Sequence, residues 1–229
     1  MCAEFTPGQP LEVEKLLQGL AHLRILFDPT KYQGDPHQSS RIFPHQLAPI
    51  IFCDPNSREF IYQEAEFGLI PHWWKPQAKE KRPRFATYNA RLESIEEKAS
   101  FKTAFKNSPC LIPIDQFFET SDPEITAHEF SGHRVGFSTG KPLWAAGARE
   151  EWLQPETGEL IPSFTIITTT PDEAILKVGH DRSPVFLNTE TALSWVQEKQ
   201  NAPQKFLLDH ALNLASDWQI TKDRKLKSR

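Results

Sequence analysis

Short apolar runs rich in β-branched and aromatic residues occupy the middle of the chain. Runs of this length and composition, bounded by Gly, Pro, Asn or Asp, are typical of strands. They predict strands over residues 47–52, 60–62, 110–114, 133–138, 143–148, 164–170 and 184–187.

Longer segments with apolar residues three or four positions apart predict helices toward the two ends of the chain. One helix is expected over residues 11–24, behind Pro10, and others over 93–106, 189–199 and 203–215, with Thr189 as a candidate N-cap. No internal repeat and no Gly/Ser-rich linker divides the chain. We therefore expect one α+β domain over residues 1–220, followed by a basic tail over 221–229.

The composition indicates an ordered, globular protein. With 229 residues, 38% hydrophobic residues, 16 Phe and 6 Trp, the chain can bury a large core. Its three cysteines form no CxxC pair, so neither a disulfide framework nor a cysteine-rich zinc site is predicted. No apolar run approaches the roughly 20 residues of a membrane span, and the start of the chain does not resemble a signal peptide. We expect a cytoplasmic protein.

The positive charge is unevenly distributed, although the formal net charge is −4. The segments "KPQAKEKRPR" (75–84) and "KDRKLKSR" (222–229) each carry five bases and one acid. Both are expected to be solvated surface segments. A local positive potential can still attract a polyanion to an acidic protein.

Candidate chemistry begins at the second residue, Cys2. Removal of Met1 would leave a free α-amine and a free thiol on this residue, and both are partly nucleophilic near neutral pH. An aldehyde would then be captured twice, because the amine forms a Schiff base and the thiolate closes on the same carbon to give a thiazolidine.

Three further stretches carry polar groups. In "TYNARLES", Asn89 and Arg91 are two apart, which on a strand places them on one face. Glu119 follows two phenylalanines, and a carboxylate in apolar surroundings suits a proton shuttle. His180 and Arg182 precede a strand opened by Pro184. A turn cap for Asn89, a lysine pair for Glu119 and a surface position for His180 are the structural alternatives.

Eight blocks in order resemble the SOS-response-associated peptidase (SRAP) family, whose members form covalent crosslinks with abasic sites in single-stranded DNA. The blocks are the Met-Cys start with Phe5, "FPHQLAPII" (43–51), "FGLIPHWW" (67–74), "NARLE" (89–93), "CLIPIDQFFE" (110–119), "LWAAGAREEW" (143–152), "FTIITTTPD" (164–172) and "HDRSP" (180–184). The resemblance implies mostly antiparallel sheets that form a barrel-like core with flanking helices.

The resemblance also implies the roles of four residues. Cys2 would attack the ring-opened sugar aldehyde, and Asn89 would orient the cysteine backbone and amine. Glu119 would shuttle protons during Schiff-base formation, and His180 would assist sugar ring opening and the reverse reaction. Imine formation needs a group that both accepts and donates a proton, which agrees with these assignments.

For DNA, the resemblance implies phosphate contacts by Arg91 and Arg182 and a base-stacking or wedging role for Trp73 or Trp74, with core packing as the alternative for either tryptophan. Pro44 and Pro184 are assigned to the same DNA-contacting surface. The expected partner is single-stranded DNA containing abasic sites, bound by a monomer without cofactor or metal. His128 and His133 lack a third ligand in sequence.

The chain departs from the family at Ala3 and Glu4, where Gly-Arg is usual. An anion in place of a phosphate-facing cation predicts weaker DNA binding, on the order of 1–3 kcal/mol. Lys79, Lys81 and Arg82 are candidate replacements for the lost cation. The resemblance also implies association with the nucleoid on DNA damage. Two other functions stay open: an N-terminal-cysteine peptidase or amidohydrolase, with autoproteolysis alone as its narrowest form, and a non-catalytic single-stranded DNA-binding module. Crosslinking would come with an associated peptidase (hydrolase) or lyase activity.

Overall fold

The computed structural model describes residues 3–8, 13, 23–25, 41–77, 80, 82–121 and 129–226. The helix predicted over residues 11–24 lies largely outside these residues. Its last positions belong instead to strand β2 (Leu23–Ile25), which pairs in parallel with β4.

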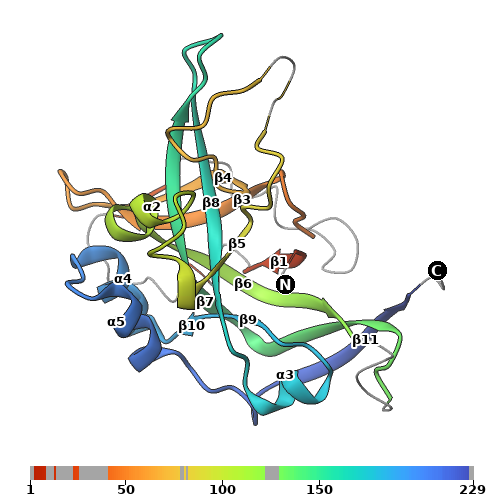
Figure 1. Ribbon diagram of the computed structural model, residues 1–229. Coiled ribbons are helices and arrows are strands. Elements are labelled where there is room, and N and C mark those ends of the chain that lie inside the picture. The colour runs from red at the N-terminus through yellow and green to blue at the C-terminus, as the bar shows by residue number, and fades with distance from the viewer. Residues whose placement is uncertain are drawn as a thin grey trace.

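The described strands belong to one sheet (Figure 1). They are β1 (Phe5–Pro7), β2, β3 (Leu47–Cys53), β4 (Phe60–Phe67), β5 (Asn89–Arg91), β6 (Pro109–Thr120), β7 (His133–Leu153), β8 (Leu160–Thr169), β9 (Ser183–Pro184), β10 (Phe186–Leu187) and β11 (Gln219–Lys225). Each predicted strand falls on one of these except the run 184–187, which is divided between β9 and β10 because Pro184 pairs with β8 and Phe186 with β7. The two runs 133–138 and 143–148 are a single long strand, because both pair with β6 across a bulge.

The pairings among five strands form a closed ring in the order β6, β3, β4, β8 and β7, with β7 paired back to β6. Most of these pairs are antiparallel, but β4, β5 and β2 each make a parallel pair. Alternate residues along the strands are buried in two clusters, one centred on Phe5, Phe67, Phe117 and Phe164, and the other on the opposite face, around Trp195. The α+β prediction is therefore supported, with a large mixed sheet and few helices.

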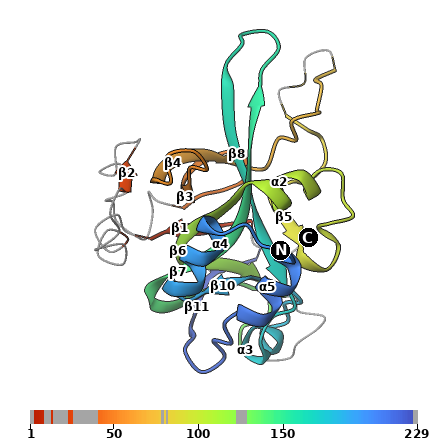
Figure 2. The same ribbon diagram turned by 90° about the vertical axis from the view of Figure 1, so that its left-hand side faces the viewer.

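The helices are short. Those that carry Phe105, Trp195 and Leu207 pack into one core cluster, whereas the helix that carries Ile175 lies apart from them and packs into the other (Figures 1 and 2). The described helices are η2 (Leu92–Ser94), α2 (Lys102–Asn107), α3 (Glu173–Lys177), α4 (Thr189–Gln197) and α5 (Pro203–His210). Trp195 of α4 is buried, and its indole N–H donates to the carbonyl of Cys110 in β6. None of the described helices is long and apolar enough to cross a membrane.

Three helix predictions need correction. The segment 93–106 is not one helix, because turns separate η2 from α2. The helix expected over 203–215 ends at His210, since the amide of Leu212 donates to the carbonyl of Phe186 in the sheet. The N-cap of α4 is Asn188 rather than Thr189, because the Asn188 side chain accepts from the amide of Thr191.

The basic C-terminal segment also differs from expectation. Strand β11 pairs antiparallel with β7 through Lys225, so the segment expected as a tail from residue 221 begins inside the sheet. Its side chains are mostly exposed, and β7 is its one strand partner among the described residues. Charged side chains suit such an edge strand.

Gly147 on β7 is packed between two neighbouring strands. A Cβ at this position would lie 2.4 Å from Cδ1 of Ile112 and 2.8 Å from the backbone oxygen of Thr165. We expect Gly147→Ala to lower the free energy of unfolding by about 1–3 kcal/mol, because overpacking shifts the backbone. Urea unfolding checks this against Gly136→Ala on the same strand, where the nearest atom is the flexible end of Gln116. Equal losses in the two variants would contradict the packing argument.

Candidate active site

Two of the predicted catalytic side chains meet directly. Glu119 is the second-last residue of β6 and is only 1% exposed. His180 lies in the loop between α3 and β9, and its Nε2 is 3.0 Å from Oε2 of Glu119. The surface and lysine-pair alternatives for these two residues are therefore wrong.

The loop that carries His180 is fixed from both sides. Asp172 caps α3 by accepting from the amides of Ala174 and Ile175, and Gly179 ends the helical turn at φ 87°, a conformation that favours glycine. Ser121, just beyond β6, donates from its buried hydroxyl to the carbonyl of Val178 at 2.7 Å. The end of β6 thus holds the segment from which the imidazole projects.

The hydrogen bonds of His180 allow one proton to be shared with Glu119. Nδ1 is 3.0 Å from the carbonyl oxygen of Arg182 and 3.3 Å from its amide nitrogen. If Nδ1 carries hydrogen and donates to the carbonyl, Nε2 accepts a proton from Glu119. In the other tautomer, Nε2–H donates to the carboxylate. In both cases a single proton lies between the two side chains, as acid–base chemistry requires.

Asn89 and Arg182 are arranged around β8. Asn89 begins β5 opposite Ile166 and is 9% exposed, so it does not occupy an exposed turn. Further along β8, Thr168 pairs with Arg91 on one side and Pro184 on the other. Strand β8 therefore lies between the strand of Asn89 and the strand that follows His180.

Arg182 does not present its guanidinium to solvent. Its two terminal nitrogens each donate to the Glu93 carboxylate at 2.9 Å, and the side chain is largely buried. Burial opposes ionisation of Glu93, but the hydrogen bonds from Arg182 hold the pKa of that carboxyl below its ordinary value. The fork expected to bind a phosphate is used to fasten the His180 loop to η2.

The N-terminal strand runs beside Glu119. Phe5 pairs with Phe117, and the amide of Phe118 donates to the carbonyl of Glu4 at 2.9 Å. In this antiparallel register, Ala3 lies opposite Glu119. Cys2 itself lies outside the described residues.

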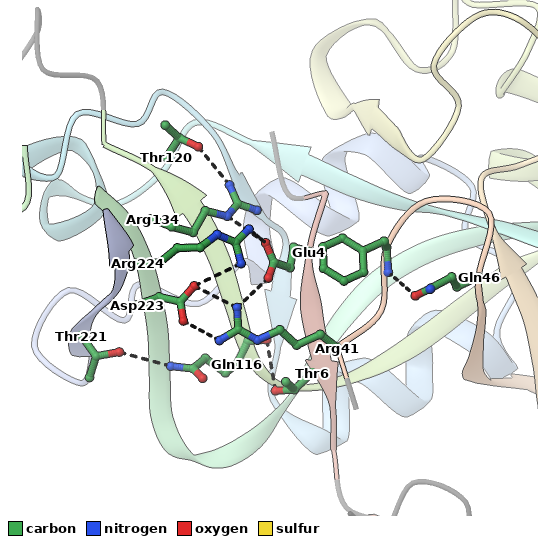
Figure 3. A network of polar contacts seen from close by, with 11 residues as sticks. Glu4, Thr6, Arg41, Gln46, Gln116, Thr120, Arg134, Thr221, Asp223 and Arg224 are labelled. Atoms are coloured by element: carbon green, nitrogen blue, oxygen red, sulfur yellow. Dashed lines mark hydrogen bonds and ion pairs between the residues drawn. The ribbon is translucent and has the colours of Figure 1, made fainter. Parts of the chain in front are cut away.

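Glu4 is buried among arginines rather than exposed, as Figure 3 shows. Its carboxylate accepts from Arg41 at 2.7 Å, Arg134 at 2.9 Å and Arg224 at 3.3 Å. Arg41 also binds both oxygens of Asp223 and holds the pKa of that carboxyl below its ordinary value. The expected repulsion of DNA by Glu4 rested on an exposed charge, and this geometry removes that premise.

Sequence reasoning missed the cluster of charged residues around Glu4. Arg41, Arg134, Asp223 and Arg224 come from distant parts of the chain and belong to no motif. The one available signal was Glu4 itself, because an acidic residue beside a buried aromatic requires a cationic partner.

The two candidate tryptophans differ in burial. Trp74 is 7% exposed and packs against Trp152 with ring centroids 5.1 Å apart, so its core alternative applies. Trp73 is 45% exposed and stacks on the equally exposed Phe85. Only Trp73 of the pair offers an aromatic face at the surface.

The remaining candidates divide between surface and interior. Arg91 is exposed at the end of β5, and Pro44 is half-buried in the turn after Ile42, which bridges to Phe5. Pro184 is buried in β9. Of the cations proposed to replace the lost arginine, Arg82 is bound by the Glu66 carboxylate, whereas Lys79 and Lys81 lie outside the described residues.

The two described cysteines are poor nucleophiles. Burial raises the pKa of Cys110 to about 12, and burial also raises the pKa of the half-buried Cys53. A thiol is reactive as the thiolate, which these environments disfavour. No group of three or more His, Cys, Asp or Glu side chains suited to a metal ion occurs in the described part of the chain, which excludes His128.

The chain is similar to a known protein family and to several of its members. The family described as "SOS response associated peptidase (SRAP)" matches residues 1–222 of this chain. The chain is 32% identical over 173 residues to abasic site processing protein YoqW of Bacillus subtilis (strain 168), covering 75% of this chain and 72% of that protein. It is 26% identical over 187 residues to abasic site processing protein HMCES of Xenopus tropicalis, covering 72% of this chain and 54% of the relative.

A solved structure shares the fold. A protein from Bordetella bronchiseptica superposes with a TM-score of 0.70 at 19% identity, covering 96% of this chain and 99% of that one. The family match spans almost all of the chain and includes the elements that carry Glu119 and His180. This protein therefore belongs to the SOS response associated peptidase family.

Proposed function

We propose that this protein processes abasic sites in DNA by forming a covalent crosslink between Cys2 and the open-chain sugar of an abasic site in a single strand. The observation that carries the proposal is the buried Glu119–His180 pair, with the N-terminal strand hydrogen-bonded to the residue before Glu119. The relatives' names, which describe abasic site processing, support the same substrate.

The chemistry follows from these groups. After removal of Met1, the α-amine of Cys2 attacks the C1 aldehyde, and Glu119 accepts the proton that the nitrogen loses. The pair then returns a proton to the carbinolamine hydroxyl, which leaves as water and gives the imine. The Cys2 sulfur adds to the imine carbon while its proton passes to the nitrogen. The balance is one thiazolidine formed and one water released.

The other residues have supporting roles in this proposal. Asn89 orients the backbone and amine of the cysteine, and His180 assists sugar ring opening and the reverse reaction. Exposed Arg91 binds a phosphate, while Trp73 with Phe85 offers a sequence-tolerant stacking surface. Pro44 lies two residues after Ile42, which bridges to Phe5 of β1, and is proposed to contact the same strand of DNA. Arg182 acts by holding the His180 loop, since its fork is bound by Glu93.

Intact mass spectrometry tests the proposal with the wild-type protein and a single-stranded oligonucleotide carrying one abasic site. We expect loss of Met1 and an adduct lighter than the sum of the reactants by one water. The same oligonucleotide without the abasic site is the control and should give no adduct. A processed N-terminus without any adduct would refute the crosslinking proposal.

The competing functions give different results in the same assay. An N-terminal-cysteine amidohydrolase would turn over an amide substrate, with the α-amine of Cys2 as its base. A binding module would retain DNA without any change of mass. The buried Glu119–His180 pair favours the crosslinker, because imine formation uses a shared proton that simple binding does not need.

A further inference from the structure

We infer that Glu4 is a positioning residue: it fastens the N-terminal segment to both neighbours of Glu119 and thereby sets where the residue-2 amine and thiol meet the carboxylate. This inference rests on the proposed function and extends it. The family resemblance implies an arginine where this chain has Glu4, so the arrangement belongs to this chain's own residues.

The attachment has two parts, on the backbone and on the side chain. The Glu4 carbonyl accepts from the amide of Phe118, which precedes Glu119. The Glu4 carboxylate accepts from Nε of Arg134, and Nη1 of the same arginine donates to the hydroxyl of Thr120, which follows Glu119. One residue is therefore linked to both sides of the catalytic carboxylate.

Covalent geometry transmits this attachment to the nucleophile. Two residues of extended chain span at most about 7 Å, so a fixed Glu4 limits the reach of Cys2. Reactions between held groups depend steeply on their placement, and an error of about 1 Å can cost on the order of 100-fold in rate. An N-terminal strand of three residues needs such an anchor.

The Glu4 carboxylate is buried within a cluster of charged side chains. The cluster contains three arginines and the two acids Glu4 and Asp223, which leaves one net positive charge. The Glu4 side chain is only 2% exposed, so its charge depends on those partners. Figure 3 shows the carboxylate pointing between Arg41, Arg134 and Arg224, with β11 supplying the last of these.

The test separates chemistry from DNA affinity. Crosslinking rates are measured at saturating abasic oligonucleotide, and Kd is measured on an intact oligonucleotide. For Glu4→Gln and Arg134→Gln we expect the maximal rate to fall ~10-fold or more, with less loss for Arg134→Lys, which keeps the charge. Arg224→Gln is the matched control: it removes the same charge, but Arg224 is more than half exposed, and among the described residues it makes no hydrogen bond to Thr120.

A second substrate without phosphate groups tests the chemistry independently of DNA binding. Thiazolidine formation with propionaldehyde, a small uncharged aldehyde, should show the same fall in rate for Glu4→Gln. If Glu4 acted instead by repelling DNA, Glu4→Gln would bind DNA more tightly and react with propionaldehyde at the wild-type rate. If it were only structural, the thermal midpoint would fall while the rate of the folded protein stayed unchanged.

Each outcome distinguishes this inference from the function on which it rests. A wild-type protein that forms the adduct, with Glu4→Gln forming it at the same maximal rate, would overturn the positioning role alone. A wild-type protein that forms no adduct with the abasic oligonucleotide would overturn both. If the maximal crosslinking rate fell equally in Arg134→Gln and Arg224→Gln, the loss of one positive charge would explain both results. That outcome would also overturn the inference.

Discussion

Cys2→Ala is expected to abolish the stable adduct with abasic DNA, a loss of at least about 100-fold, equal to more than about 2.7 kcal/mol of activation free energy. The alanine variant keeps an N-terminal amine after removal of Met1, so a Schiff base can still form. Without the thiol that imine hydrolyses. Borohydride, which reduces an imine to a stable amine, should therefore trap the variant on DNA, whereas untreated samples should show no adduct.

Cys53→Ala is the control for this experiment. It removes a half-buried thiol whose pKa burial raises, and it leaves Cys2 in place. We expect its adduct yield to equal that of the wild type. An adduct that survives in Cys2→Ala without borohydride, or that disappears in Cys53→Ala, would assign the nucleophile to another residue and refute the proposed chemistry.

Glu119→Gln is expected to have the second largest effect, a fall in crosslinking rate of about 10²–10⁴-fold, as for loss of a general acid–base. Glutamine has nearly the same shape and can still hydrogen-bond to His180, but it cannot take up the proton released by the amine. Stability should change little by comparison. Rates of adduct formation under single-turnover conditions, with urea unfolding in parallel, separate the two effects.

The chain offers a second carboxylate–imidazole pair for comparison. Glu150 on β7 and His72 lie 3.3 Å apart, outside the proposed site. Glu150→Gln should therefore crosslink at the wild-type rate. If Glu119 and His180 act as one unit, the double variant should be little slower than Glu119→Gln alone. Additive losses would show that the two side chains act in separate steps.

The strands were readable from the sequence because apolar runs of four to eight residues have few alternatives. The long β7 was not readable as one strand, since "STGKP" between its halves resembles a turn. Only the pairing of both halves with β6, on either side of the bulge at Asp115, joins them into one strand. The helix over 93–106 failed for the opposite reason. Its periodicity is real, but local turns after Ser94 and the packing of Phe101 and Phe105 leave only Lys102–Asn107 α-helical.

For the candidate site, the sequence identified the residues but not their contacts. Sequence alone supplied Cys2, Asn89, Glu119 and His180, because their types suit one reaction and their blocks occur in family order. It could not show that Glu119 and His180 lie within hydrogen-bond distance, nor that Trp74 and Arg182 are turned inward. Those facts depend on contacts between residues far apart in the chain.

Glu4 shows the limit most clearly. The family resemblance implies a cation at this position near Cys2, and this chain has an anion. The sequence determined only that change of charge. The tertiary structure decided its consequence, because β7, β11 and the segment before β3 bring Arg134, Arg224 and Arg41 to one carboxylate. The effect of a charge depends on its burial and its neighbours, and both are properties of the folded chain rather than of the position.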